Sequence, residues 1–202
     1  MDLSNITDFL LNLVEHLGYV GIFFMTLVES SFVPIPAEVT MIPAGYLVHQ
    51  GKMNFMLVYF SSVAGSVAGG YVNYWIAYHY GRNLFLKYPK IFMMSPDKFD
   101  KVEEYFRDHG AISVFTGRLL PAVKHYIGFP AGLARMDLKT YLFYCILSGA
   151  LWMGLLLGVG YLVGEHRELI QQYIFWVKIG LLSFVTILGT IYTIRFYKKR
   201  KR

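Results

Sequence analysis

The chain has 202 residues, of which 55% are hydrophobic and only 16% are charged. This balance is typical of an integral membrane protein and argues against a soluble domain. The formal net charge of +6 does not indicate nucleic-acid binding, because the basic residues are spread through loops and gathered in a tail at 196–202. Cys145 is the only cysteine, which excludes an intrachain disulfide and argues against a cysteine-based metal site.

The first apolar stretch follows an N-terminus without basic residues, so it does not resemble a signal peptide and we expect the protein to retain it. At about 20–48 this stretch is long enough to cross a bilayer, but Pro34, Pro36 and Pro43 interrupt it. Proline removes a helical donor and clashes with the preceding turn, so two short helical arms are predicted, with Gly45 as a further breaker. Non-helical backbone at membrane depth survives only against protein or water, which favours a re-entrant hairpin.

The next two regions are predicted to be a crossing helix and a surface linker. A bilayer core of about 30 Å needs roughly 20 apolar residues of helix, and residues 53–80 provide them. The region at about 81–110 is rich in lysine and arginine and is predicted to be a cytoplasmic linker. Within it, 95–109 has the pattern of an amphipathic helix lying on the membrane surface.

The second half of the chain repeats this order. Pro121 and Pro130, with Gly132, predict a second re-entrant hairpin at about 112–134. Crossing helices are predicted at 140–164 and 173–195.

The positions of the basic residues predict the orientation of the chain. Lysine and arginine are absent before Lys52 and concentrate at 81–107 and in the tail, so we expect the N-terminus outside and the C-terminus in the cytoplasm. If one broken stretch crossed completely, a basic region would lie on the wrong side, and we rank that alternative lower.

The two broken stretches share a repeated pattern. Residues 34–45 and 121–132 both read P-x8-P-A-G, at an offset of 87 residues. The same offset carries the crossing helix at 53–80 onto 140–167. Repeat 1 is thus predicted at about 16–80 and repeat 2 at about 111–164. With the predicted orientation the hairpins enter from opposite faces, so the sequence predicts a single all-α membrane domain of two inverted repeats. Such repeats with broken helices are the architecture of secondary transporters.

Four charged residues lie in the broken stretches: Glu29 and Glu38 in the first, Arg118 and Lys124 in the second. An ionised side chain at the centre of a membrane helix costs roughly 2.5–3.5 kcal/mol, so these groups must face one another or water. One interpretation is a neutral ion-pair lock between the hairpins. The other is a site in which Arg118 and Lys124 bind an anionic headgroup while Glu29 or Glu38 takes up and releases a proton.

Other candidate residues give weaker signals. His125, Tyr126 and Asn73 are predicted to line the site, although a backbone carbonyl is the more common partner for a histidine in such a place. The histidines show no metal-ligand spacing, and no phosphate loop, Ser-His-Asp set or cysteine nucleophile is present. We therefore expect no enzymatic activity and no cofactor, with protons as the coupling ion.

The motifs that carry these residues resemble the DedA family, also called SNARE-associated or VTT-domain membrane proteins. The resemblance covers roughly 15–165 and implies a re-entrant-hairpin protein of the bacterial inner membrane that moves lipids, driven by the proton-motive force. By motif position Glu29 and Glu38 correspond to the family's essential acids, and Arg118 and Lys124 to its paired basic residues. The second position commonly holds arginine in the family, so the bidentate fork is lost at Lys124. The matching motifs are ESSFVPIPAE at 29–38, GRLLPAVK at 117–124, AGLARM at 131–136 and GYLVG at 160–164.

The sequence favours a translocase for a phosphate-bearing lipid, such as undecaprenyl phosphate or phosphatidylethanolamine. One alternative is a proton-coupled antiporter for cations or cationic drugs, in which the acids bind the substrate. Another is a non-transporting assembly factor that recruits membrane partners through 95–109 and the tail. The expected partners are membrane lipids and not nucleic acid, and a homo-oligomer is compatible with the sequence.

Overall fold

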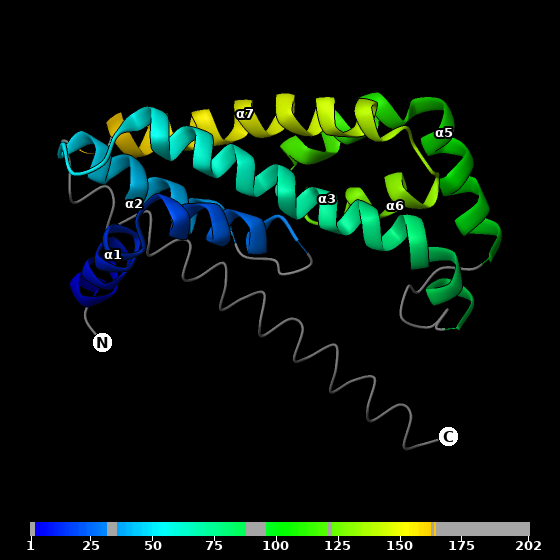
Figure 1. The fold of residues 1–202 in the computed structure, drawn as a ribbon, viewed down its shortest axis with the longest axis horizontal. Coiled ribbons are helices and arrows are strands. Elements are labelled where there is room, and N and C mark those ends of the chain that lie inside the picture. The colour runs from blue at the N-terminus through cyan, green and yellow to red at the C-terminus, as the bar shows by residue number, and fades with distance from the viewer. Residues whose placement is uncertain (1–2, 32–35, 88–95, 121–122, 163, 165–202) are drawn as a thin grey trace, which may run out of the picture.

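The structure is a computed structural model, and it describes residues 3–31, 36–87, 96–120, 123–162 and 164. These residues form helices joined by turns, and no strand occurs among them, which confirms the predicted all-α class (Figure 1). The helix predicted at 173–195 and the basic tail at 196–202 lie outside the described residues. The helices are α1 (Leu3–Glu29), α2 (Glu38–His49), α3 (Phe55–Lys87), α5 (Pro96–Leu119), α6 (Gly128–Leu133) and α7 (Leu138–Leu162).

Three stretches among the described residues are long and apolar enough to cross a membrane by length and composition: Leu11–Glu29, Phe55–Gly81 and Leu138–Leu162. The second and third coincide with the predicted crossings at 53–80 and 140–164. The first reaches into the predicted hairpin. Large apolar side chains such as Phe60 and Leu162 are 63% and 74% exposed, as expected for helices that face lipid.

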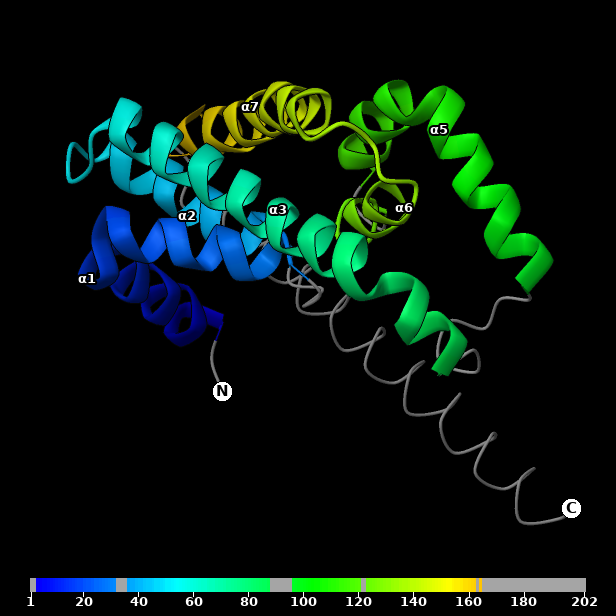
Figure 2. The same cartoon turned by 45° about the vertical axis from the view of Figure 1, so that its right-hand side comes forward.

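In the first helix pair, α1 packs along the N-terminal half of α3, and α2 packs mainly against α7 and α1 (Figures 1 and 2). Lys52, just before α3, forms an exposed ion pair with Glu15 of α1, and Gly69 farther along α3 lies against the backbone of Leu27. The chain turns after Glu29, and α2 leads back to the start of α3. Both ends of this helix pair therefore lie at the same end of α3, while its turn lies beside the middle of α3.

In the second helix pair, α6 packs along the C-terminal half of α3, whereas α5 packs against α6 and α7. Gly110 of α5 lies next to Met136, at the far end of the pair, and Arg118 near the end of α5 lies against Gly70 of α3. From Gly128, which lies against the carbonyl of Gly70, α6 runs away toward the end of α3. The turn of the second pair is thus also beside the middle of α3.

The two long helices α3 and α7 run antiparallel and join the two pairs. The Tyr59 hydroxyl donates to the carbonyl of Ala150 at 3.3 Å, and the Tyr141 hydroxyl donates to the carbonyl of Gly70 at 2.8 Å.

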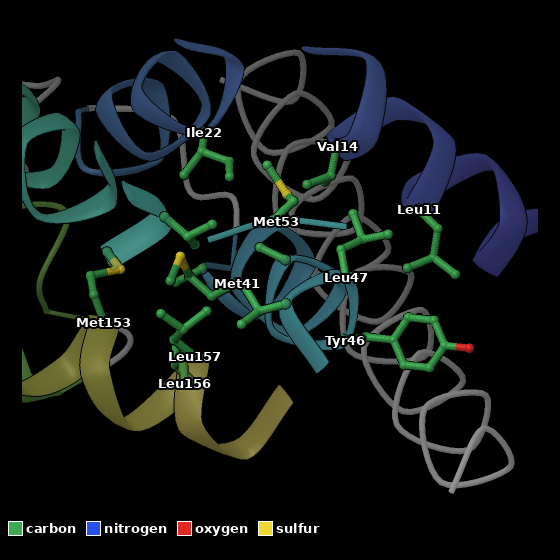
Figure 3. Packing of buried hydrophobic residues seen from close by; sticks show 14 residues of the cluster. Leu11, Val14, Ile22, Met41, Tyr46, Leu47, Met53, Met153, Leu156 and Leu157 are labelled. Carbon is green, nitrogen blue, oxygen red and sulfur yellow. The ribbon is translucent and has the colours of Figure 1, made fainter. Parts of the chain in front are cut away.

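Apolar packing occurs in two separate clusters, one around each helix pair. Figure 3 shows the first cluster, in which side chains of α1, α2 and α7 interdigitate. The second cluster joins α3, α5, α6 and α7. Polar groups fill the space between the two clusters. The first cluster includes Leu11, Val14, Ile22, Met41, Leu47, Met153 and Leu157, and the second includes Tyr74, Phe106, Val114, Ile127, Ala131, Tyr141 and Cys145.

Several predicted helix breakers do not break helices. Pro43 lies inside α2, where packing against α7 compensates for the missing donor. Pro130 is in the first turn of α6, where its backbone nitrogen would have no helical partner in any case. Gly45 and Gly132 lie within helices at close approaches, to Gly160 and to the backbone of Tyr74 respectively, where a Cβ would collide. Their lack of a side chain serves packing.

The predicted boundary between the amphipathic helix at 95–109 and the second hairpin is also absent. A single helix, α5, covers both, because nothing between Pro96 and Leu119 interrupts the backbone hydrogen bonding. Gly110 sits within it, and Met136 packs against this glycine.

Candidate functional site

The turn of the first helix pair places a carboxylate inside the protein. Glu29 is the last residue of α1, and its side chain is fully buried. The helix ends there because the next residues satisfy the last carbonyls locally: Ser30 N–H donates to Thr26, and the Ser31 hydroxyl to Val28. Pro36 then excludes a continuing helix. The end of α1 thus fixes Glu29 beside the middle of α3.

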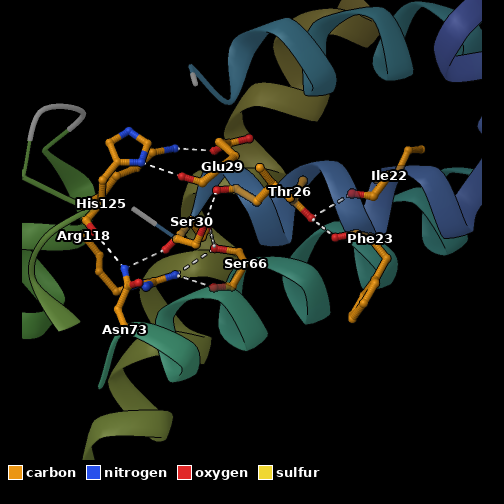
Figure 4. Close-up of polar contacts among 12 residues, drawn as sticks. Ile22, Phe23, Thr26, Glu29, Ser30, Ser66, Asn73, Arg118 and His125 are labelled. Atoms are coloured by element: carbon orange, nitrogen blue, oxygen red, sulfur yellow. Dashed lines mark hydrogen bonds and ion pairs between the residues drawn. The ribbon is translucent and has the colours of Figure 1, made fainter. Parts of the chain in front are cut away.

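The turn of the second helix pair brings a lysine to the same place. Lys124 Nζ donates to Glu29 Oε1 at 2.6 Å, and both side chains are buried (Figure 4). Turns at 123–127 direct the lysine toward α1. The Lys124 ammonium also lies 6.0 Å from the centroid of the Trp152 ring on α7, a weak cation–π contact.

Arg118 reaches the site from the last turn of α5, and its side chain is buried. Its Nη2 donates to the Ser66 hydroxyl at 2.7 Å and to the Ser66 carbonyl at 3.3 Å. Gly70 makes room for it, since a Cβ there would lie 2.6 Å from Nη1. Among the residues that the structure describes, no carboxylate lies within ion-pair distance of Arg118. The guanidinium is therefore held by neutral groups.

A network of uncharged groups ties the two turns to α3 (Figure 4). Asn73 Nδ2 donates to the carbonyl of Ser30 at 3.3 Å and to that of His125 at 2.8 Å. His125 Nδ1 lies 2.6 Å from the carbonyl of Glu29, and the Ser30 hydroxyl donates to the Ser66 hydroxyl at 3.0 Å. The backbone-carbonyl partner expected for His125 is confirmed.

Three buried polar atoms of this cluster have no hydrogen-bond partner within the described part of the chain: Glu29 Oε2, Arg118 Nε and Asn73 Oδ1. Buried polar groups are nearly always paired, and each unpaired one costs about 1–3 kcal/mol. A ligand that supplied both a donor and acceptors would satisfy them.

The site lies near the middle of both long apolar helices. The residues of α3 that contact it, Ser66, Gly70 and Asn73, lie close to Ala68, the midpoint of the apolar stretch Phe55–Gly81. On α7, Trp152 lies close to the midpoint of Leu138–Leu162.

Sequence reasoning identified most of the charged groups but not their neutral partners. Glu29, Arg118, Lys124, His125 and Asn73 come together as expected. Glu38 begins α2 and is half-buried, and no ion pair joins it to a cation among the described residues. Tyr126 is 50% exposed, and its ring lies edge-on to that of His125 with centroids 6.4 Å apart, so its role as a lining residue stays a prediction. Pro34 and Pro121 lie outside the described residues.

Ser30, Ser66 and Gly70 were missed. Ser66 and Gly70 had no sequence signal beyond a small or polar residue in an apolar helix, and Ser30 lies within the family-like motif at 29–38 but was not singled out. No group of three or more histidine, cysteine or acidic side chains suited to a metal ion occurs among the described residues.

Comparisons with known proteins identify the family of the chain. The VTT domain family matches residues 35–162, which is more than half of the chain. The uncharacterized membrane protein YbfM of Bacillus subtilis is 31% identical over 152 residues, covering 75% of this chain and 94% of that protein. No solved structure matches the chain.

Two named relatives are similar over most of their length. Undecaprenyl phosphate transporter A of Bacillus subtilis is 29% identical over 163 residues, which cover 81% of this chain and 80% of that protein. Protein DedA of Escherichia coli is 24% identical over 211 residues, which cover 96% of this chain and 95% of that protein. The chain therefore belongs to the DedA family of VTT-domain membrane proteins.

Proposed function

We propose that this membrane protein is a proton-motive-force-dependent translocase for lipids with a phosphate headgroup. The observation that carries the proposal is Arg118, a buried guanidinium held by Ser66 with no acid paired to it among the described residues. Burying an unpaired cation at mid-membrane depth is costly, and a site kept for an anionic ligand gives a reason for it. The similarity to an undecaprenyl phosphate transporter supports this class of substrate.

The charges suggest how the headgroup is accepted. Glu29, Lys124 and Arg118 together carry one excess positive charge, which suits one anionic group. A phosphate that binds Lys124 must displace Glu29 from it, because Glu29 Oε1 occupies the ammonium at 2.6 Å. Glu29 would then lose its partner in a buried place and would take up a proton. Binding of phosphate and uptake of a proton are thereby coupled.

Arg118 and Lys124 play different parts in this scheme. The planar guanidinium of Arg118 offers parallel donors to two phosphate oxygens, and its Nε has no partner among the described residues. Lys124 acts as a point charge that moves between Glu29 and the headgroup. The lipid tails would stay in the bilayer. No covalent step is involved, so we propose no enzymatic activity.

The arrangement of the helix pairs supports re-entrant hairpins as the scaffold. Each pair begins and ends at one end of α3 and turns beside its middle, and the two pairs use opposite ends. We propose that they enter the membrane from opposite faces as inverted repeats, with the N-terminus outside and the C-terminus in the cytoplasm. We also propose, from the family resemblance, that the protein lies in the inner membrane of a bacterium.

Lipid transport in proteoliposomes tests the proposal. The purified protein is reconstituted, and movement of a labelled phosphate lipid between leaflets is followed with and without an imposed pH gradient. Arg118→Ala and Glu29→Gln should both abolish movement, with and without the gradient. Lys52→Ala, which breaks an exposed lysine–glutamate pair of the same kind, is the matched control and should transport normally. Normal transport by both site variants would falsify the mechanism.

The same assay separates the alternatives. In a cation antiporter the acid binds the substrate, so Arg118→Gln would retain transport while Glu29→Gln would not. A non-transporting assembly factor would move no lipid in this assay. Its assembly activity would survive both variants and would be abolished by deletion of 196–202.

A further inference from the structure

The structure has a cleft that is distinct from the buried site of Glu29, Lys124 and Arg118. It has a volume of about 600 Å³ and opens between the C-terminal half of α3 and the connection from α6 to α7. Tyr71, Trp75 and Tyr78 line one wall, and Arg135 and Asp137 line the other. We call it the aromatic cleft. It shares no residue with the Glu29, Lys124 and Arg118 site. Tyr74 also lines the cleft, and its ring stacks on that of Tyr141 with the two ring centroids 4.6 Å apart.

The backbone at Arg135 is in a conformation that favours glycine. Arg135 follows the last turn of α6 with φ of +49°, and it is the only non-glycine residue with positive φ among the described residues. Its N–H donates to the carbonyl of Gly132 and that of Met136 donates to Ala131, which closes the helix in a Schellman motif. Glycine is the usual residue at this position, so an arginine here is a strained choice that points to a use for its side chain.

That side chain lies over an aromatic ring. The Arg135 guanidinium is 5.5 Å from the centroid of Tyr78, and no carboxylate lies within ion-pair distance of it among the described residues. Contact with the ring orients the planar group at the edge of the cleft, and its N–H donors bond to no other residue in the described part of the chain. Phosphate is the anion that best matches such a fork.

Asp137 supplies a fixed negative charge across the cleft entrance. Its Oδ2 accepts hydrogen bonds from the Thr140 N–H and hydroxyl, both at 2.9 Å, as the cap of α7. Oδ1 makes neither of these bonds. The backbone N–H of Thr140, and then its hydroxyl, hold the pKa of Asp137 below its usual range, so the group stays ionised. Asp137, Tyr71 and Trp75 line the same cleft, and a carboxylate together with aromatic rings is a combination that binds ammonium groups.

The position of the cleft indicates where such a ligand comes from. Leu138 begins the apolar stretch of α7, and Arg135 and Asp137 lie just before it. The cleft therefore extends from the boundary between hydrocarbon and water, at Arg135 and Asp137, toward the middle of α3 at Tyr71, and its outer end lies at the level of lipid headgroups.

We propose that the aromatic cleft binds the zwitterionic headgroup of a phospholipid, with the phosphate on Arg135 and the ammonium between Asp137 and the rings of Tyr71 and Trp75. This goes beyond the transport proposal, because the cleft holds a headgroup at the membrane boundary whether or not that lipid moves through the central site.

Trp75 lies in the cleft and serves as the reporter of binding. With Trp152→Phe and Trp176→Phe as background, its fluorescence is titrated in nanodiscs of phosphatidylglycerol. The probes are short-chain phosphatidylethanolamine, short-chain phosphatidate and water-soluble phosphoethanolamine. We expect saturable binding of phosphatidylethanolamine at least about tenfold tighter than that of phosphatidate. Equal affinities would overturn the proposal and leave the rings as interface anchors. Tighter binding of phosphoethanolamine than of the lipid would assign the site to a soluble ligand.

Matched variants identify the groups responsible. Arg135→Gly suits the backbone and removes the side chain, and Arg135→Asn is a second neutral variant that tolerates positive φ; both should weaken binding about tenfold or more. Asp137→Asn keeps the helix cap but should erase the preference for phosphatidylethanolamine over phosphatidate. Lys139→Ala removes a neighbouring charge that does not line the cleft and should bind normally. Unchanged binding by both Arg135 variants, or unchanged preference in Asp137→Asn, would refute the assignment.

The central site is separable in this experiment. Lys124→Ala and Glu29→Gln should leave the Trp75 titration unchanged, whereas they should stop lipid movement in proteoliposomes. If the fluorescence of Trp75 does not respond to phosphatidylethanolamine while lipid transport still depends on Arg118, the cleft proposal alone is overturned. If Trp75 responds while transport does not depend on Arg118, the transport mechanism alone is overturned.

Discussion

Lys124 and Glu29 lie 95 positions apart in the sequence, yet their charged atoms meet at 2.6 Å in a fully enclosed place. Each residue stands at the turn of a different helix pair. The contact therefore joins the two halves of the protein at their innermost points, and it has consequences for stability as well as for ligand binding.

Breaking this pair from one side should be costly. Lys124→Ala leaves the Glu29 carboxylate buried without its partner, a change worth about 3–5 kcal/mol in comparable buried pairs. Lys52→Ala breaks the exposed pair with Glu15, which is worth about 0–1 kcal/mol. Thermal unfolding of the purified proteins measures both. The double variant Lys124→Ala/Glu29→Gln should recover much of the loss, and no recovery would mean that the pair is not the source of it.

Adding one methyl group at Gly70 should disturb Arg118 without unfolding the protein. A Cβ at this position would lie 2.6 Å from Arg118 Nη1, and a flexible side chain can move away from it. Gly70→Ala should therefore lower lipid transport about tenfold or more while the melting temperature changes little. Gly158→Ala is the matched control on α7, because a Cβ there meets nothing within 4 Å. Equal transport by the two variants would show that the placement of the guanidinium is not critical.

Replacing Arg135 by glycine should not destabilise the protein. An L-residue in the left-handed region costs roughly 1–2 kcal/mol, and the exposed stacking on Tyr78 returns about 0.5–1 kcal/mol. The strain outweighs the contact, so the melting temperature of Arg135→Gly should equal or exceed that of the unmodified protein. Arg135→Ala keeps the strain, loses the contact and should melt lower. A lower melting temperature for the glycine variant would contradict the strain argument.

The cap at the start of α7 predicts a pH dependence. The pKa of Asp137 is lowered by the Thr140 N–H, so its contribution to stability is fully present above the ordinary carboxyl value of about 4. That contribution disappears as the pH falls through the lowered pKa that Asp137 has in the folded state. The difference in melting temperature between the unmodified protein and Asp137→Ala should thus be constant above about pH 5 and shrink in stronger acid. Asp137→Asn, which caps without a charge, should show no such trend.

Cysteine labelling tests the membrane arrangement. In a Cys145→Ser background, an impermeant maleimide should label Gly51→Cys only from outside the cell and Lys139→Cys only from the cytoplasm. Leu120→Cys, at the turn of the second helix pair, should resist labelling from outside if that pair is re-entrant. Labelling of Leu120→Cys from outside would mean that α5 crosses the membrane completely.

The charged part of the site could be predicted from the sequence, because charges in apolar stretches must find partners. The four charges were expected on this ground to face one another or water, but the pairing of Glu29 with Lys124 in particular was not predicted. The neutral partners follow from three-dimensional packing: Ser66 and Gly70 meet Arg118 only because α3 passes between the two turns. Nothing in their local sequence distinguishes them from packing residues.

The helix boundaries were predicted less well, since proline and glycine have more than one structural role. Pro43 is tolerated inside α2 because neighbouring helices hold it in place, and Gly45 serves the close approach of α2 to α7. The strain at Arg135 has no sequence signature, because an arginine after a short helix is ordinary until its φ is known.

The side chain of Asn73 limits how the protein can move. Its amide nitrogen carries two hydrogens, and one is committed to each turn, through the carbonyls of Ser30 and His125. A rocking motion that opens the centre toward one face must break one of these bonds while the other remains. The released hydrogen then points toward the space that has just opened. Asn73 would thus act as a pivot that can offer its free donor only to one face of the membrane at a time.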